Sequence, residues 1–132
     1  AKKMAAKITL GNRPKNFKAV ATFAMLDGSE GSIECIFKYR TKREFGAFVD
    51  SAKESAGIRI SDKKGDEISW EEVHELGIEA NADHLVGIVE GWNLDVEPTR
   101  DNFQQLADEL PAAANAIFET YRKAVLEGRL GN

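Results

Sequence analysis

The chain has 132 residues, of which 42% are hydrophobic and 30% charged, and its formal net charge at pH 7 is −4. These values fit one globular domain with one hydrophobic core and exclude the disordered and fibrous classes. No apolar run approaches the roughly 18 residues that span a membrane, and Cys35, the only cysteine, excludes an internal disulfide and a thiol-rich metal site. We therefore expect a protein of the reducing cytosol without an export signal.

The charges are unevenly distributed along the chain. Residues 1–26 carry six Lys and Arg side chains and no acid, whereas residues 62–110 carry fourteen acids against three basic residues. Such an asymmetry can steer an oppositely charged partner, although a solvated arm followed by acidic helix faces explains it more simply. Because an acidic body repels a phosphate backbone, we do not expect nucleic acid as a partner.

Residues 1–15 are predicted to form a flexible lead-in, and residues 16–132 a single α+β domain. Apolar and polar residues alternate from Phe17 to Leu26 and again from Ile33 to Arg40, which is typical of half-buried strands. The intervening Asp27-Gly28-Ser29-Glu30-Gly31 supplies the glycines of a hairpin loop. This region is therefore predicted to be an antiparallel β-hairpin.

The Thr41-to-Glu44 segment is a capping box that predicts the start of a helix, with Gly57 as its stop. We expect this helix to lie across the apolar face of the hairpin, because neither element can bury its apolar stripe alone. Ile58 to Ile60 suits a short strand, and Asp62 to Glu67 a polar connection.

A second capping box, Ser69 to Glu72, predicts the next helix, with a break around residues 81–83. Residues 85–91 suit either a helix or a buried strand, and we favour the helix. Thr99 is the expected N-cap of a further helix, and Pro111 ends that helix and begins the last one. The predicted fold class is α+β: an N-terminal antiparallel β-hairpin, with room for one small extra strand, packed against four or five α-helices.

No enzyme motif is complete. His74 begins a zinc-protease pattern, but Ile78 occupies the place of the second histidine. A calcium loop after Asp62 fails because Lys64 stands at its third position and Val73 at the position of the bidentate glutamate. Cys35 is expected to be a buried and inert thiol. We therefore predict that the protein is not an enzyme, and that it has no catalytic, cofactor-binding or metal-binding residues.

From about Met4 to Asn132 the chain resembles the tail assembly chaperones of long, non-contractile phage tails. The hairpin and the helix that begins near Phe45 fit the start of that family. The resemblance extends through the rest of the chain, where the order and spacing of several residues fit the family. These are Gly91-Trp92, Asn102-Phe103, Pro111, Ile117-Phe118, Tyr121 and Gly128-Arg129-Leu130-Gly131-Asn132.

The resemblance implies a chaperone encoded by a phage or prophage that acts in the host cytoplasm and is absent from the mature virion. Its implied partners are the tail tape measure protein and the tail tube protein. It also implies that this chain is the shorter of two products where the family uses ribosomal frameshifting. The alternative function is a minor structural tail or connector protein of the virion.

A chaperone of this kind needs apolar surface for its client. The candidate partner-binding residues are Trp92, Leu94, Phe103, Phe118, Tyr121 and Leu130. The helical spacing of Phe103, Phe118 and Tyr121 is more typical of a core than of an interface. Surplus apolar surface can also be covered by self-association, which allows a dimer or a larger ring.

Overall fold

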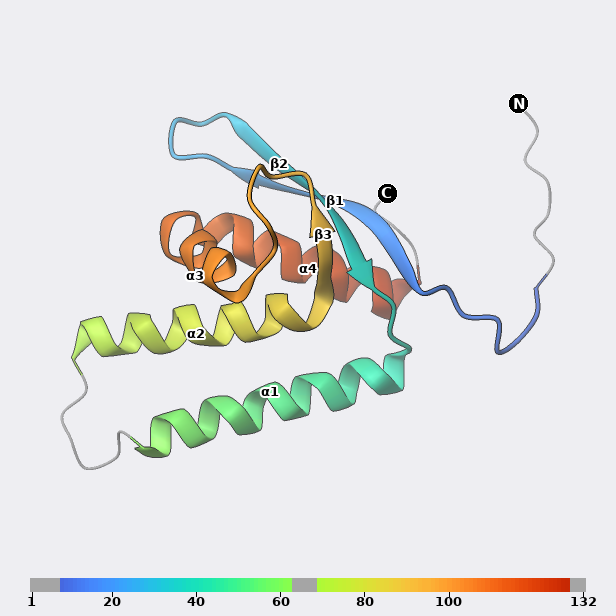
Figure 1. Cartoon of the computed structure of the whole chain (residues 1–132), viewed down its shortest axis with the longest axis horizontal. Coiled ribbons are helices and arrows are strands. Elements are labelled where there is room, and N and C mark those ends of the chain that lie inside the picture. Colours follow the sequence, from blue (N-terminus) through green and yellow to red (C-terminus); the bar gives the residue numbers. More distant parts are fainter. Residues whose placement is uncertain (1–7, 63–68, 129–132) are drawn as a thin grey trace.

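The computed structural model describes residues 8–62 and 69–128 of the chain. Within these residues a three-stranded sheet and four helices form an α+β fold, as predicted (Figure 1). The predicted polar connection from Asp62 to Glu67 falls mostly outside the described residues. In chain order the elements are β1 (Asn16–Ala24), β2 (Glu30–Lys38), α1 (Lys42–Asp62), α2 (Trp70–Ile88), β3 (Val89–Trp92), α3 (Arg100–Glu109) and α4 (Pro111–Glu127).

The predicted hairpin is confirmed. β1 pairs with β2 in an antiparallel register without a bulge, from Asn16 opposite Lys38 to Ala24 opposite Glu30. Gly28 has a φ of 88°, a left-handed conformation that glycine adopts without steric cost. The Asp27 carboxylate accepts hydrogen bonds from the backbone N–H and the hydroxyl of Ser29, which fixes the turn.

The third strand does not lie where the sequence predicted a short strand. Residues 58–60 are helical and belong to the last turns of α1, so that strand prediction was wrong. The third strand is β3, which continues directly from α2 and pairs antiparallel with the free edge of β2. Residues 85–91 are therefore divided: the helix that we favoured holds as far as Ile88, and Val89 begins the strand.

The apolar face of the hairpin is covered by α4 rather than by α1, so the prediction that the first helix lies across this face was wrong (Figure 1). The Tyr121 ring of α4 lies 5.9 Å from that of Phe17 in β1 and 5.3 Å from that of Phe37 in β2. α1 instead runs beside α2 and reaches the core through Phe45, whose ring lies 5.9 Å from Tyr121. Packing favours α4 because it presents four fully buried residues, namely Ala113, Ala114, Ile117 and Tyr121.

Two predicted helix interruptions are absent. α1 passes through Gly57 and ends at Asp62, and its Arg59 forms an ion pair of 2.6 Å with Asp83 of α2. α2 is continuous across residues 81–83, where Ala82 is fully buried. A helix tolerates glycine at a cost of about 1 kcal/mol, which contacts with a neighbouring helix can outweigh.

The predicted helix starts at Ser69, Thr99 and Pro111 are confirmed. The hydroxyls of Ser69 and Thr99 accept hydrogen bonds from the backbone N–H groups of Glu72 and Asn102. Pro111 occupies the first turn of α4. Gly128 closes that helix with a left-handed φ of 70°.

Candidate partner-binding surface

Trp92 is held at the end of the sheet, where β3 meets the loop that leads to α3. Its half-buried ring stands edge-on to Phe103 of α3, with 5.1 Å between ring centroids. Its indole N–H donates a hydrogen bond of 2.6 Å to the carbonyl oxygen of Val96. The large ring therefore joins the sheet edge, the loop and α3 in one rigid unit.

The loop after β3 is fixed by further hydrogen bonds. Asn93 continues the ladder, since its backbone N–H donates to the Glu34 carbonyl and its side-chain oxygen accepts from the Glu34 N–H. At the far end of the loop, the Asn102 side chain donates to the Glu97 carbonyl at 2.8 Å. With both ends held, Leu94 and Val96 remain 36% and 47% exposed.

These residues line a groove of about 220 Å³ between the loop and α3, which we call the Trp92 groove. Its volume fits one or two apolar side chains rather than a metabolite, because small-molecule sites usually measure ~300–1,000 Å³. In its lining Leu106 is buried, whereas Asp95 and Glu109 are exposed and form a polar rim, an arrangement typical of a protein-binding surface. The groove is lined by Trp92, Leu94, Asp95, Val96, Asn102, Gln105, Leu106, Glu109 and Leu110.

The other predicted contact residues lie elsewhere. Phe103 supports the groove from beneath and is 1% exposed, and Tyr121 is fully buried at the centre of the core. Phe118 is half-buried on α4, where its ring contacts those of Phe45 and His84. Leu130 lies outside the described residues. The structure thus brings Trp92 and Leu94 together at the surface and places Phe103 and Tyr121 in the interior.

Val96, Leu106 and Leu110 also line the groove but were not among the predicted contact residues. Leu106 and Leu110 follow Phe103 at helical spacing, which is typical of a core stripe, and Leu106 is indeed buried. In the sequence, the only sign of this groove was Val96, an apolar residue within the polar Asp95-to-Pro98 segment.

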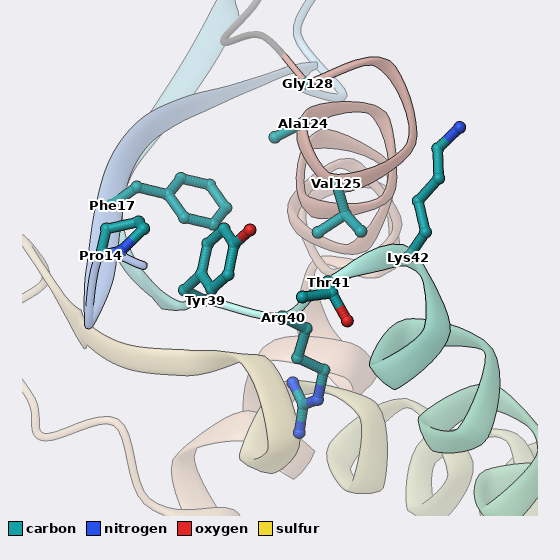
Figure 2. Close-up of a pocket in the computed structure, with 9 residues that line it drawn as sticks. All are labelled: Pro14, Phe17, Tyr39, Arg40, Thr41, Lys42, Ala124, Val125 and Gly128. Atoms are coloured by element: carbon teal, nitrogen blue, oxygen red, sulfur yellow. The ribbon is translucent and has the colours of Figure 1, made fainter. Parts of the chain in front are cut away.

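A second, larger cavity of about 410 Å³ opens between the start of β1, the β2–α1 connection and the end of α4 (Figure 2). Phe17 and Tyr39 form one wall, and Val125 of α4 faces them. The Arg13 guanidinium lies 5.5 Å from the centre of the Tyr39 ring and is paired with Glu44. No sequence motif marked this cavity, because its walls come from three segments that are far apart in the chain.

Arg40 also lines this cavity and is half-buried, but its guanidinium is engaged by other parts of the protein. Figure 2 shows its side chain directed away from Phe17 and Tyr39. Its guanidinium donates hydrogen bonds to the Gly87 carbonyl at 2.6 Å and to the Tyr121 hydroxyl at 3.2 Å. It also covers the Phe48 ring at 4.1 Å. Arg40 therefore ties the end of the sheet to α1, α2 and α4.

The titratable side chains of the core are unsuited to catalysis. Burial raises the pKa of the Cys35 thiol to about 12, so the thiol is protonated and inert, as predicted. Burial lowers the pKa of His84, against the opposing effect of the neighbouring Asp83 carboxylate. In residues 8–62 and 69–128, no group of three or more His, Cys, Asp or Glu side chains is arranged to hold a metal ion.

A family model described as "Phage tail assembly chaperone" matches residues 4–132. The match covers nearly the whole chain, so the protein belongs to the phage tail assembly chaperone family. Membership confirms the resemblance seen in the sequence, and it confirms the prediction of a non-catalytic protein. Comparison with curated proteins and with solved structures gave no match. In the described part of the chain, each helix is too short or too polar to cross a membrane.

Proposed function

We propose that this chaperone binds the tail tape measure protein and helps to recruit tail tube subunits during tail morphogenesis. It acts in the host cytoplasm and is left out of the mature virion. The Trp92 groove is the observation that carries the proposal. A chaperone must cover apolar side chains of its client without inserting them into its own core, and a shallow, rigid groove meets this requirement.

The rigidity of the groove favours binding. Because hydrogen bonds already fix the Trp92 ring and the loop, little conformational entropy is lost when a client side chain enters. The acidic side chains on the rim, Asp95 and Glu109, add a preference for a client segment that carries Lys or Arg beside its apolar residues.

Co-expression with the tape measure protein of the same phage tests the proposal. We expect the wild-type chain to keep that protein in solution and to be recovered with it in a pull-down. Leu94→Glu places a charge in the groove and should abolish recovery. Leu126→Glu is a matched control, because Leu126 is 37% exposed on the last turn of α4, outside the residues that line the groove. Equal recovery with both variants would show that the client binds elsewhere.

Mass spectrometry of purified particles separates the chaperone from the alternative of a minor tail or connector protein. The proposal requires that the chain be absent from mature particles. Its presence there at a fixed copy number would support the structural alternative instead.

A further inference from the structure

Within residues 8–62 and 69–128, the outer edge of β1 carries backbone groups that pair with no other strand. In the sheet order β1-β2-β3, β1 pairs only with β2 among the described strands. The Tyr39 N–H donates to the Lys15 carbonyl, and the Met25 N–H donates to the Ser29 carbonyl. Antiparallel pairs alternate along a ladder, so the odd-numbered residues of β1 exchange hydrogen bonds with β2. The backbone N–H and C=O groups that point away from β2 belong to Asn16, Lys18, Val20, Thr22 and Ala24.

This edge lacks the features that usually protect an edge strand from pairing. Natural edges are kept short, interrupted by proline or a bulge, or lined with charges. β1 is nine residues long, pairs without a bulge, contains no proline and has one charged side chain, Lys18. At its centre Val20 is 53% exposed. The edge is therefore a ready template for another strand.

The sequence of β1 is nearly symmetric about Val20. An antiparallel partner centred on this residue would place Phe17 opposite Phe23, Ala19 opposite Ala21 and Val20 opposite itself. Lys18 would face a threonine, so no like charges would meet. Each β1 residue whose backbone N–H and C=O groups point away from β2 would then lie opposite a residue of the same kind in the partner strand. Self-complementarity of this kind is the requirement for a two-fold interface between identical chains.

We infer that two copies of this chain pair through β1 to form a continuous six-stranded sheet. The two-fold axis is perpendicular to that sheet, so both α4 helices lie on the same face. α4 contacts α1 and α2 on the flank that carries Phe118. Ala116 and Thr120 lie roughly 160° around the helix from Phe118, at 100° per residue. These small, half-buried residues allow the two α4 helices to approach closely.

Measured mass and hydrogen exchange test the dimer. Sedimentation equilibrium of the full chain should give twice the monomer mass, and Val20→Asp should raise the dissociation constant at least about tenfold, because two carboxylates would face each other. Ser32→Asp is the control, on an exposed residue of β2 that the pairing does not use. Dimerisation should also protect the Val20 and Thr22 amides. A monomeric mass at every concentration would overturn the inference.

Cross-linking provides a second measurement, because a disulfide traps the dimer covalently. Residues that share hydrogen bonds across an antiparallel pair have Cα atoms about 5.5 Å apart, which suits a disulfide. Val20→Cys should therefore give a disulfide-linked dimer on mild oxidation, whereas Leu26→Cys, in the fully exposed hairpin loop, should cross-link far more slowly. Equal rates for the two variants, or protection of the β1 amides only when a different protein is added, would show that a second copy is not the partner.

Discussion

Alanine at Gly87 tests the packing of α1 against α2, because the same substitution at Gly77 in the same helix meets no neighbour. A Cβ atom at Gly87 would lie 2.3 Å from Cε1 of Phe48 and 2.6 Å from its Cζ, whereas one at Gly77 would meet no atom within 4 Å. The Phe48 ring cannot withdraw freely, since the Arg40 guanidinium covers it at 4.1 Å. Relief of the clash requires that the Phe48 ring leave its packed position or that α1 and α2 move apart.

The two substitutions should change the free energy of unfolding in opposite directions. Replacing glycine by alanine inside a helix stabilises it by about 0.5–1 kcal/mol, and Gly77→Ala should show that full gain. At Gly87 the clash adds a cost of about 1–3 kcal/mol, which exceeds the gain. The two variants should therefore differ by about 2 kcal/mol, or ~8 °C in Tm for a chain of this length.

Urea unfolding followed by circular dichroism measures the difference. Comparable slopes of the three unfolding curves would show that the substitutions act on the native state. Equal stabilisation of both variants would refute this packing of α1 on α2, because Phe48 would then not rest on Gly87. The double variant Gly87→Ala with Phe48→Ala checks the cause, since removal of the ring should abolish the clash at Gly87.

Three further predictions concern single side chains. Thr99→Ala should lower the unfolding free energy by about 1 kcal/mol, since it removes the N-cap of α3, and Thr99→Ser should restore it, both measured by thermal unfolding. Burial lowers the pKa of His84 from its ordinary value of 6.5, so its contribution to stability is complete above pH 6.5 and is lost as the pH falls below that value. Urea unfolding at pH 7 and pH 5 should therefore show a smaller loss of stability for His84→Gln than for wild type. Cys35, with a pKa of about 12, should resist alkylation at pH 8 until the chain unfolds, and rapid labelling of the native protein would contradict its burial.

Local patterns predicted most of the elements. The alternation from Phe17 onwards is the direct result of one buried face on a two-residue repeat, so the hairpin follows from the sequence. Ser69 and Thr99 mark helix starts through hydrogen bonds that span only three residues, and such signals require no tertiary contact.

The failures occurred where local preference and tertiary packing disagree. Gly57 is a plausible helix stop by itself, but Arg59 lies beyond it and pairs with Glu79 and Asp83 of α2, which favours continuation of the helix. Val89 follows a helix without a break and is a strand residue only because β2 has an edge that β3 can join. Each outcome depends on a neighbour that is distant in the sequence.

The partner-binding surface also depends partly on local sequence and partly on tertiary contacts. Composition and spacing selected Trp92 and Leu94, together with four other apolar residues, but they could not separate core from surface. The groove forms only because the Trp92 ring, the Val96 carbonyl and the side of α3 meet in space.

The sequence alone determined the fold class, the hairpin and most helix boundaries, and it carried the resemblance that the family match confirmed. Tertiary structure alone decided that α4 covers the sheet, that a third strand follows α2, and which aromatic side chains remain exposed. The physical reason is range: capping and periodicity act over a few residues, whereas burial depends on which faces of distant elements fit together.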